Sequence, residues 1–182
     1  MKKLRGVKFL SENATYDEMN SPVGRLTIIT SLKGLHAVLW ENDRQNTRIE
    51  KIINNLSRSK NESTIVQTKL QLIEYFQGKR KIFDLPLVID GTDFQIQVWN
   101  QLRNIPYAMT ITYAEQAEKI GNRNKARSVG TANGLNPISI IIPCHRVIGS
   151  NGHLTGFGGG LEKKAFLLQL EKNKARKQHE KY

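Results

Sequence analysis

The sequence lacks the features that define several classes of protein. Only one of its 182 residues, Cys144, is a cysteine, so an internal disulfide and a cysteine-rich metal cage are both excluded. No stretch approaches the roughly 18 to 20 uninterrupted apolar residues of a membrane span. The basic residues 1–8 are followed by no apolar region typical of a secretory signal, and the chain has no internal repeats or low-complexity segments. We therefore expect a cytoplasmic protein with one domain of ordinary size or two small ones.

Acidic residues are scarce relative to basic ones. The chain has 28 Lys and Arg against 16 Asp and Glu, which gives a formal net charge of +12. A positive potential of this size attracts and holds polyanions such as nucleic acid. Part of the excess lies in a basic tail, residues 173–182, which we expect to be a solvated end of the chain.

The first half of the sequence is typical of a small sheet covered by helices. Residues 26–30 and 35–40 are rich in β-branched and apolar side chains, and the turn between them predicts a β-hairpin. Two amphipathic helices that cover the sheet are predicted by apolar residues at helical spacing: Ile49, Ile52, Ile53 and Leu56 in the first helix, and Val66, Leu70, Ile73 and Phe76 in the second. Pro86 and Gly91 mark a connecting segment, so we place the first domain at residues 1–88 and the second at 91–172.

The second half begins with a pattern of three short helices. The first starts at the cap formed by Thr92 and Asp93 and ends before Pro106. Residues 112–115 fit a capping box that starts a second helix, and residues 125–133 predict a third. The last two helices are a candidate helix-turn-helix. The helix over residues 125–133 has small residues on either side of Arg127, which would let its backbone lie close to a nucleic-acid groove. These small residues are Ala126, Ser128, Gly130, Thr131 and Ala132. The pattern fits a tightly packed helical hairpin equally well.

The only thiol follows a short apolar segment. Residues 138–142 predict a buried strand that ends at Pro143 and Cys144, with His145 and Arg146 next in the sequence. A free thiol has a pKa near ~8.5, so Cys144 needs a nearby base or cation to react as a thiolate. On an extended backbone neighbouring side chains point to opposite faces, so His145 needs a bend or a bridging water to reach the sulfur. A cysteine after an apolar run is also a common small core residue, and this alternative stays open.

Two further features follow Cys144. The glycine-rich residues 156–160 let a flat ligand approach the backbone, but they lack the lysine and hydroxyl residue that end a phosphate-binding loop. The final helix has its expected core side at Leu161, Ala165, Phe166, Leu167 and Leu168, and it reaches Glu171 near its end. Because a carboxylate at a helix C-terminus is unfavourable with the helix dipole, Glu171 either has a partner that offsets this cost or is solvated.

Several separated blocks of the sequence closely resemble, in the same order, the O6-alkylguanine-DNA alkyltransferases, or methylated-DNA-protein-cysteine methyltransferases. The blocks are 136–148 with its Pro-Cys-His-Arg-Val core, 126–130, 155–161, 91–95, 105–107, 112–113 and, more loosely, 21–26. The similarity covers nearly the whole chain. It implies an α+β fold, with a small ribonuclease H-like N-terminal domain of sheet and helices and a mostly helical, winged-helix-like C-terminal domain that contains a helix-turn-helix.

The resemblance also implies a reaction. Family members flip the damaged nucleotide out of the duplex and transfer its O6-alkyl group to a cysteine in one displacement, which restores guanine and leaves a spent protein. Cys144 would be the acceptor, His145 the base acting through a water, and Glu171 the group that orients His145. Tyr113 would hydrogen-bond guanine N3, and Arg127 would replace the extruded base in the stack. O4-methylthymine stays open as a second substrate.

The remaining implied roles concern DNA and the guanine pocket. The implied minor-groove contacts are Ala126, Ser128, Gly130 and Thr131. Asn136 would tie the helix-turn-helix to the cysteine segment, and Val147, Phe157 and Gly158 would line the pocket. No cofactor is implied, and because the first domain offers only His36 as a candidate ligand, we expect no structural zinc. The expected partner is double-stranded DNA containing O6-alkylguanine, bound by a monomer that does not associate with membranes.

The sequence departs from the family pattern at Phe157, at Ser128 and in residues 133–135, where some members have a bulkier or basic residue. Phe157 stands where tyrosine is common, which changes the polarity of the pocket, and Ser128 stands where alanine is frequent. Two rival functions also fit parts of the sequence. A non-catalytic DNA-binding protein would use the same helix-turn-helix with Cys144 buried. A cysteine hydrolase would pair Cys144 with a distant histidine and turn over repeatedly.

Overall fold

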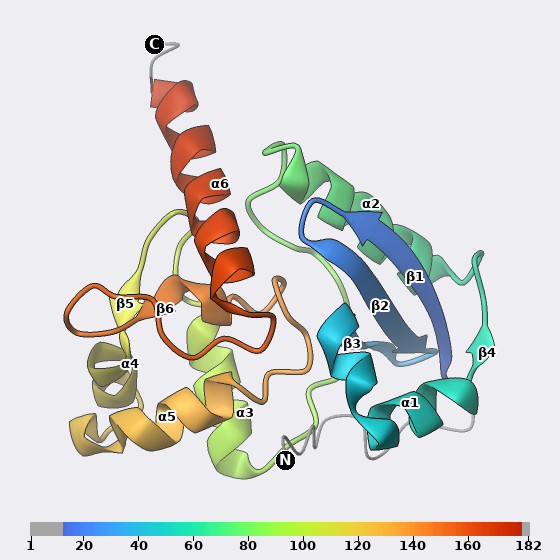
Figure 1. Ribbon diagram of the computed structural model, residues 1–182, viewed down its shortest axis with the longest axis horizontal. Coiled ribbons are helices and arrows are strands. Elements are labelled where there is room, and N and C mark those ends of the chain that lie inside the picture. The colour runs from blue at the N-terminus through green and yellow to red at the C-terminus, as the bar shows by residue number, and fades with distance from the viewer. Residues whose placement is uncertain (1–12, 180–182) are drawn as a thin grey trace. The chain divides into compact units, whose positions relative to one another are not determined.

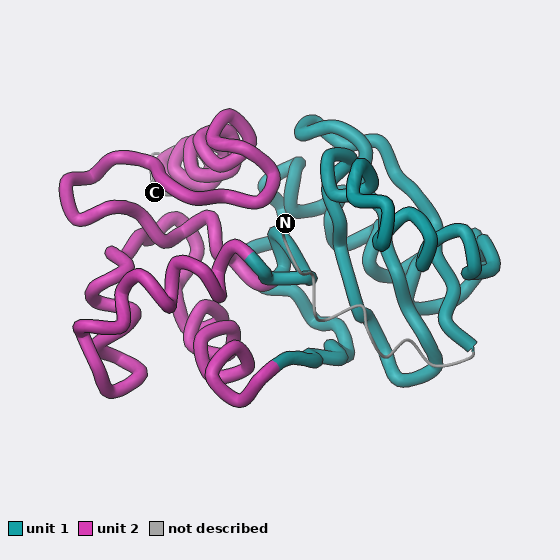
Figure 2. The backbone as a smooth tube through the Cα atoms, turned by 60° about the horizontal axis from the view of Figure 1, so that its bottom comes forward, with its two compact units in different colours: residues 1–91, 135–141 teal, residues 92–134, 142–182 magenta. Residues whose placement is uncertain are grey.

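The computed structural model describes residues 13–179, which fall into two compact units. Unit 1 comprises Met1–Gly91 and Leu135–Ile141, and unit 2 comprises Thr92–Gly134 and Ile142–Tyr182 (Figure 2). No sequence pattern indicated that residues 135–141 return to unit 1. The basic residues 1–8 and the last three residues of the predicted tail, 180–182, lie outside the described residues.

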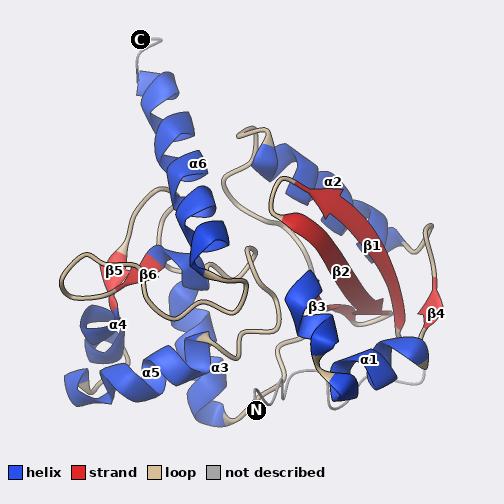
Figure 3. Ribbon diagram, viewed as in Figure 1, coloured by secondary structure: helices blue, strands red, loops and turns tan. Residues whose placement is uncertain are grey.

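Unit 1 is built on a four-stranded sheet in the order β3-β2-β1-β4 (Figure 1, Figure 3). β1 (Thr15–Ser21), β2 (Gly24–Ser31) and β3 (Gly34–Trp40) are antiparallel neighbours, and β4 (Ser57–Arg58) pairs parallel with β1. The predicted hairpin is therefore confirmed as β2 and β3. β1 and β4 were not predicted, because β1 consists mainly of polar residues and β4 has only two residues.

Helices cover both faces of this sheet. The 3-10 helix η2 (Glu41–Gln45) leads into α1 (Thr47–Asn54), and α2 (Ser63–Phe76) follows β4. α1 closes a core cluster of Ile29, Ala37, Leu39, Ile49 and Ile53. Tyr16 packs against this cluster, so the side chain of its strand neighbour Asp17 points to the other face of the sheet. Lys69 of α2 forms an ion pair with Asp17, which places α2 on that other face. Both predicted helices are confirmed.

The buried face of α2 differs from the prediction. Val66, Leu70 and Ile73 are 44, 47 and 45% exposed. The buried side chains are instead Ile65, Thr68, Gln71, Leu72 and Tyr75. Gln71 explains part of this choice, since its amide donates to the carbonyl of Asp84 at 2.7 Å and accepts from its N–H at 2.9 Å. A polar residue with two backbone partners thus belongs to the buried face, which apolar spacing alone does not reveal.

Unit 2 is mostly helical. Its elements are α3 (Asp93–Leu102), β5 (Ile111–Thr112), α4 (Tyr113–Lys119), η3 (Arg123–Lys125), α5 (Ala126–Asn133), η4 (Cys144–Arg146), β6 (Val147–Ile148) and α6 (Leu161–His179). Capping boxes at Thr92 and Thr112 start α3 and α4, which confirms the predicted starts. α3, α4 and α5 pack together, with the buried Trp99 indole donating to the carbonyl of Ala132 at 2.9 Å. β5 and β6 form a small parallel pair.

The predicted strand at 138–142 is wrong. Ile138 makes only an isolated bridge to Val38 in β3. Ile140 has a φ of 73°, a left-handed conformation that interrupts an extended backbone. A turn then follows, in which the N–H of Ile141 donates to the carbonyl of Ser139 at 2.9 Å.

The expected core side of the final helix is also wrong in part. Leu161 and Phe166 are 47 and 39% exposed, and Ala165 is exposed too, whereas Lys164, Leu167 and Glu171 are buried. The helix continues to His179, so residues 173–179 of the predicted tail are helical and Glu171 lies within the helix. The expectation that Glu171 opposes the helix dipole is therefore wrong, because Glu171 is not at the helix end. No helix in the described part of the chain is both long and apolar enough to cross a membrane.

Candidate functional site

Cys144 lies at the start of a single turn of 3-10 helix. η4 comprises Cys144, His145 and Arg146, all three of which are buried. Cys144 is 5% exposed, and its N–H donates to the carbonyl of Ile142 at 2.9 Å. Because a 3-10 helix has about three residues per turn, the three side chains point in different directions. The backbone at Cys144 and His145 is therefore turned and not extended, so the two side chains are not restricted to opposite faces of a strand.

The Glu171 carboxylate joins η4 to α6. It accepts hydrogen bonds from four nitrogen atoms, the His145 Nε2 at 2.9 Å, the Arg146 Nε and Nη2 at 3.0 Å each, and the Ala108 N–H at 2.9 Å. Arg146 also donates from Nη1 to the carbonyl of Ile105 at 2.6 Å. Glu171 and His145 are completely buried. We call this group, Ile105, Ala108, His145, Arg146 and Glu171, the carboxylate clamp.

The clamp determines the charge states of its members. Burial raises the pKa of Glu171, but hydrogen bonds and charges from His145 and Arg146 outweigh it and bring this pKa to about 2. Burial lowers the pKa of His145, and the positive charges of Arg146 and Lys164 lower it further, against the opposite effect of Glu171. At neutral pH a neutral imidazole therefore faces an ionised carboxylate.

This arrangement also fixes the tautomer of His145. A carboxylate only accepts hydrogen bonds, so the neutral ring carries its proton on Nε2, which faces Glu171. The Nδ1 atom then has a lone pair. It is buried and has no hydrogen-bond partner among the described residues. His145 is therefore prepared to accept a proton at Nδ1.

The buried Lys164 and Tyr113 form a second hydrogen-bonded group. The Lys164 ammonium donates to the carbonyls of Val147 at 2.6 Å and Thr155 at 2.7 Å, and it lies 3.5 Å from the Tyr113 hydroxyl. The Tyr113 hydroxyl itself donates to the carbonyls of Thr155 at 3.0 Å and Gly156 at 3.2 Å. Burial lowers the pKa of Lys164 to about 8 and raises the pKa of Tyr113, and charge on Cys144 raises both values. Cys144 is therefore within electrostatic reach of both side chains.

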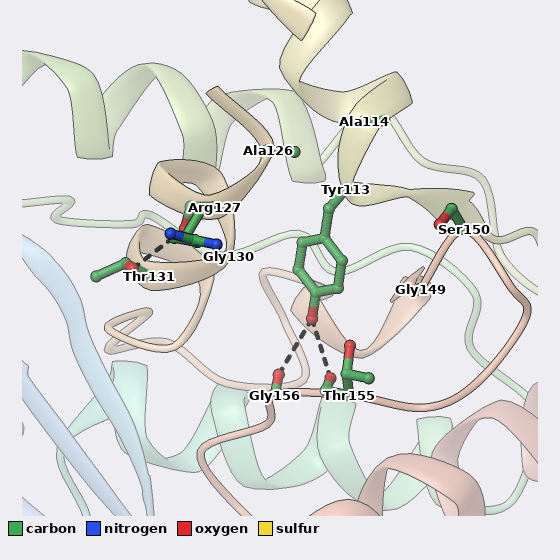
Figure 4. Close-up of a pocket in the computed structure, with 10 residues that line it drawn as sticks. All are labelled: Tyr113, Ala114, Ala126, Arg127, Gly130, Thr131, Gly149, Ser150, Thr155 and Gly156. Carbon is green, nitrogen blue, oxygen red and sulfur yellow. Dashed lines mark hydrogen bonds between the residues drawn. The ribbon is translucent and has the colours of Figure 1, made fainter. Parts of the chain in front are cut away.

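A pocket of about 540 Å³ opens between α4, α5 and the segment before α6 (Figure 4). It is lined by Tyr113, Ala114, Ala126, Arg127, Gly130, Thr131, Gly149, Ser150, Thr155 and Gly156. Gly130 lies against the Tyr113 ring, since an added Cβ would be 3.6 Å from two of its atoms. Five residues predicted from the sequence thus meet here: Tyr113, Ala126, Arg127, Gly130 and Thr131.

The other predicted residues lie elsewhere. Cys144, Val147, Phe157 and Gly158 do not line this pocket. Val147 is buried in β6, Phe157 and Gly158 are half-buried before α6, and Ser128 is exposed on α5. Asn136 belongs to unit 1, where its buried Oδ1 accepts from the N–H of Ile138 at 3.0 Å.

Sequence reasoning missed four members of these groups. The sequence suggests Arg146 as a cation beside the thiol, whereas its guanidinium binds Glu171. The backbone groups of Ile105 and Ala108 carry no sequence signal. Lys164 did carry one, because it precedes Glu171 by seven residues and so shares its helical face. Within residues 13–179 no group of three or more His, Cys, Asp and Glu side chains is placed to hold a metal ion.

Comparisons with known proteins show which family the chain belongs to. Residues 14–89 match the family described as the ribonuclease-like domain of 6-O-methylguanine DNA methyltransferase, and residues 93–173 match its DNA binding domain. These matches confirm the predicted α+β fold with an N-terminal ribonuclease-like domain and a mostly helical C-terminal domain. A methylated-DNA–protein-cysteine methyltransferase of Methanosarcina acetivorans is 44% identical over 156 residues, which cover 86% of this chain and 97% of the relative.

Solved structures show the same similarity. The O6-methylguanine methyltransferase of Mycobacterium tuberculosis has a TM-score of 0.77 and 40% identity, covering 88% of this chain and 94% of that one. The OGT protein of the same organism, solved in complex with DNA, has a TM-score of 0.71 and 38% identity over the same shares of the two chains. The chain therefore belongs to the 6-O-methylguanine DNA methyltransferase family.

Proposed function

We propose that the protein repairs O6-methylguanine in double-stranded DNA by a single, irreversible transfer of the methyl group to Cys144. The observation that carries the proposal is the hydrogen bond of 2.9 Å between the Glu171 carboxylate and the buried Nε2 of His145, one residue after the thiol, in surroundings that lower the pKa of the imidazole. Such a base activates a cysteine that would otherwise be mostly protonated at neutral pH. A buried structural cysteine needs no such neighbour.

The chemical step is a displacement at the methyl carbon. His145 takes the thiol proton of Cys144 at Nδ1 through one water molecule, and the resulting thiolate attacks the methyl group. The bond between the methyl carbon and guanine O6 breaks as the bond to Sγ forms, and the electron pair stays on the guanine. The Tyr113 hydroxyl, which Lys164 contacts, turns its proton from the carbonyls of Thr155 and Gly156 to guanine N3, and this hydrogen bond stabilises the negative charge of the leaving base.

The pocket supports the flipping of the nucleotide. Arg127 and Thr131 are exposed on α5 at its rim, and Tyr113 forms one of its walls (Figure 4). We propose that α5 enters the minor groove, where its small residues let the backbone approach, and that the Arg127 guanidinium fills the gap in the base stack. Flipping costs a few kcal/mol of unstacking, and phosphate contacts of a chain with a net charge of +12 offset it.

Repair of DNA in substoichiometric amounts of protein tests this proposal. Duplex DNA with one O6-methylguanine is incubated with increasing protein, and the restored guanine is measured by nucleoside analysis. We expect the guanine formed to equal the protein added, to stop there, and to vanish in Cys144→Ser. A duplex with O4-methylthymine, tested in parallel, determines whether the second lesion is a substrate. Repeated turnover, or repair by the serine variant, would contradict the proposal.

A further inference from the structure

Arg146 occupies the centre of the carboxylate clamp. Its guanidinium binds both oxygens of Glu171, with Nε 3.0 Å from Oε2 and Nη2 3.0 Å from Oε1, and its remaining nitrogen is held by the Ile105 carbonyl. Its charged carbon lies 5.7 Å from the centre of the Tyr107 ring. The side chain is almost completely buried. Water therefore screens the charge of this pair little, and Arg146 and Glu171 form a neutral unit beside His145.

The charged groups that face His145 come from two elements. Glu171 and Lys164 belong to α6, and Arg146 belongs to η4 together with His145 itself. Glu171 favours a protonated imidazole, whereas Arg146 and Lys164 oppose it. A buried carboxylate without Arg146 would hold an imidazolium, and an imidazolium has no lone pair with which to accept the thiol proton.

We propose that Arg146 is a positioning residue that neutralises Glu171 and thereby keeps His145 unprotonated and able to act as a base from neutral to mildly acidic pH. The inference rests on the proposed function, because it assigns His145 as the base for Cys144. Arg146 acts through Glu171. Glu171 orients the imidazole of His145, but without Arg146 its negative charge would keep that imidazole protonated.

The pH dependence of Cys144 alkylation tests this role. The single-turnover rate constant of each variant is measured from weakly acidic to weakly basic pH. A neighbouring charge typically moves a pKa by about 1 to 3. We therefore expect Arg146→Gln to move the acid midpoint of the rate upward by about one pH unit or more. Arg146→Lys keeps the charge and should leave the midpoint close to that of the unmodified protein. Arg25→Gln, which breaks exposed ion pairs in unit 1, is the matched control.

A loss of rate that is equal at every pH in Arg146→Gln, with an unchanged midpoint, would overturn the proposal and leave Arg146 a purely structural role.

A second measurement needs neither a stable Arg146→Gln nor any DNA. The imidazole nitrogens of His145, assigned by comparison with His145→Gln, are followed by NMR through a pH titration of the unmodified protein. We expect the ring to be neutral at neutral pH, with its proton on Nε2, and to become protonated only below the ordinary histidine pKa of ~6.5, because burial and the charges of Arg146 and Lys164 lower its pKa. An imidazole that protonates at or above that pH would refute the inference even if alkyl transfer occurs. A neutral imidazole in a protein that transfers no alkyl group would instead refute the proposed function.

Discussion

Replacing Glu171 with glutamine is expected to lower the free energy of unfolding by about 3 to 5 kcal/mol. The carboxylate accepts hydrogen bonds from Ala108, from His145 and from two nitrogens of Arg146. Glutamine has nearly the same shape, but its amide has one oxygen that accepts and one NH2 group that donates. The NH2 group would therefore face N–H donors where the carboxylate presents an oxygen. The buried Arg146 would lose its counter-charge at the same time. The magnitude is that of breaking a buried ion pair by removing one partner.

Urea unfolding of the variant and of the unmodified protein in a Trp40→Phe background, in which Trp99 of unit 2 is the remaining tryptophan, is followed by fluorescence and measures this loss. Glu162→Gln is the matched control, because Glu162 lies exposed on the same helix and should cost less than about 0.5 kcal/mol. The double variant Arg146→Met with Glu171→Met should cost at least about 2 kcal/mol less than the sum of its two single variants, since it leaves no unpaired charge. A loss below about 1 kcal/mol for Glu171→Gln would refute the account of the clamp.

Five other substitutions, at four positions, test the backbone and the charges of the two units. Ala108 holds Glu171 with a φ of 63°, so Ala108→Gly should leave stability unchanged or raise it by up to about 1 kcal/mol, whereas Ala108→Val should lower it in the same urea assay. Gly34→Ala should cost about 3 kcal/mol or more because the added Cβ would lie 2.2 Å from the Pro86 carbonyl oxygen; Gly121→Ala, where φ is 95° and no atom lies within 4 Å, should cost only about 1 kcal/mol. Burial raises the pKa of Asp17, but its hydrogen bonds to two cationic side chains bring it down to about 2, so its contribution of roughly 2 kcal/mol is present above pH ~4 and is lost as pH falls towards ~2. Asp17→Asn should flatten this decline in acid unfolding curves, and an unchanged decline would show that other carboxylates cause it.

Local signals predicted local structure well. The capping boxes at Thr92 and Thr112 form because the hydroxyl and the residue three positions later satisfy backbone groups of the same turn. The hairpin of β2 and β3 follows in the same way from two apolar segments separated by a short turn. The segment 138–142 has an equally apolar composition, but Ile140 adopts a left-handed conformation that composition does not specify. The buried face of α2 includes Gln71, whose side chain bonds the backbone of Asp84, 13 residues further along the chain.

In the candidate site, too, local sequence signals were informative and distant partners were not. The motif around Cys144 identified the thiol, the imidazole and the distant Glu171 through a resemblance to known proteins. The physical partners of Glu171 were less accessible, because Ala108 is 63 residues away and contributes only its backbone N–H. Lys164 was overlooked because a charged residue was not expected on the buried face of a helix, where two backbone carbonyls now satisfy it. Patterns of apolar residues describe cores, whereas this site is a buried set of charges.

The central claim is that Cys144 itself receives the alkyl group, and the intact mass of the protein tests it most directly. The protein is incubated with a duplex containing one O6-methylguanine, and the mass of the intact chain and of its peptides is then measured. The account predicts a gain of one CH2 group per chain, located on Cys144, and no gain in Cys144→Ser. A protein that binds the lesion while its mass stays unchanged, or a methyl group found on another residue, would contradict it.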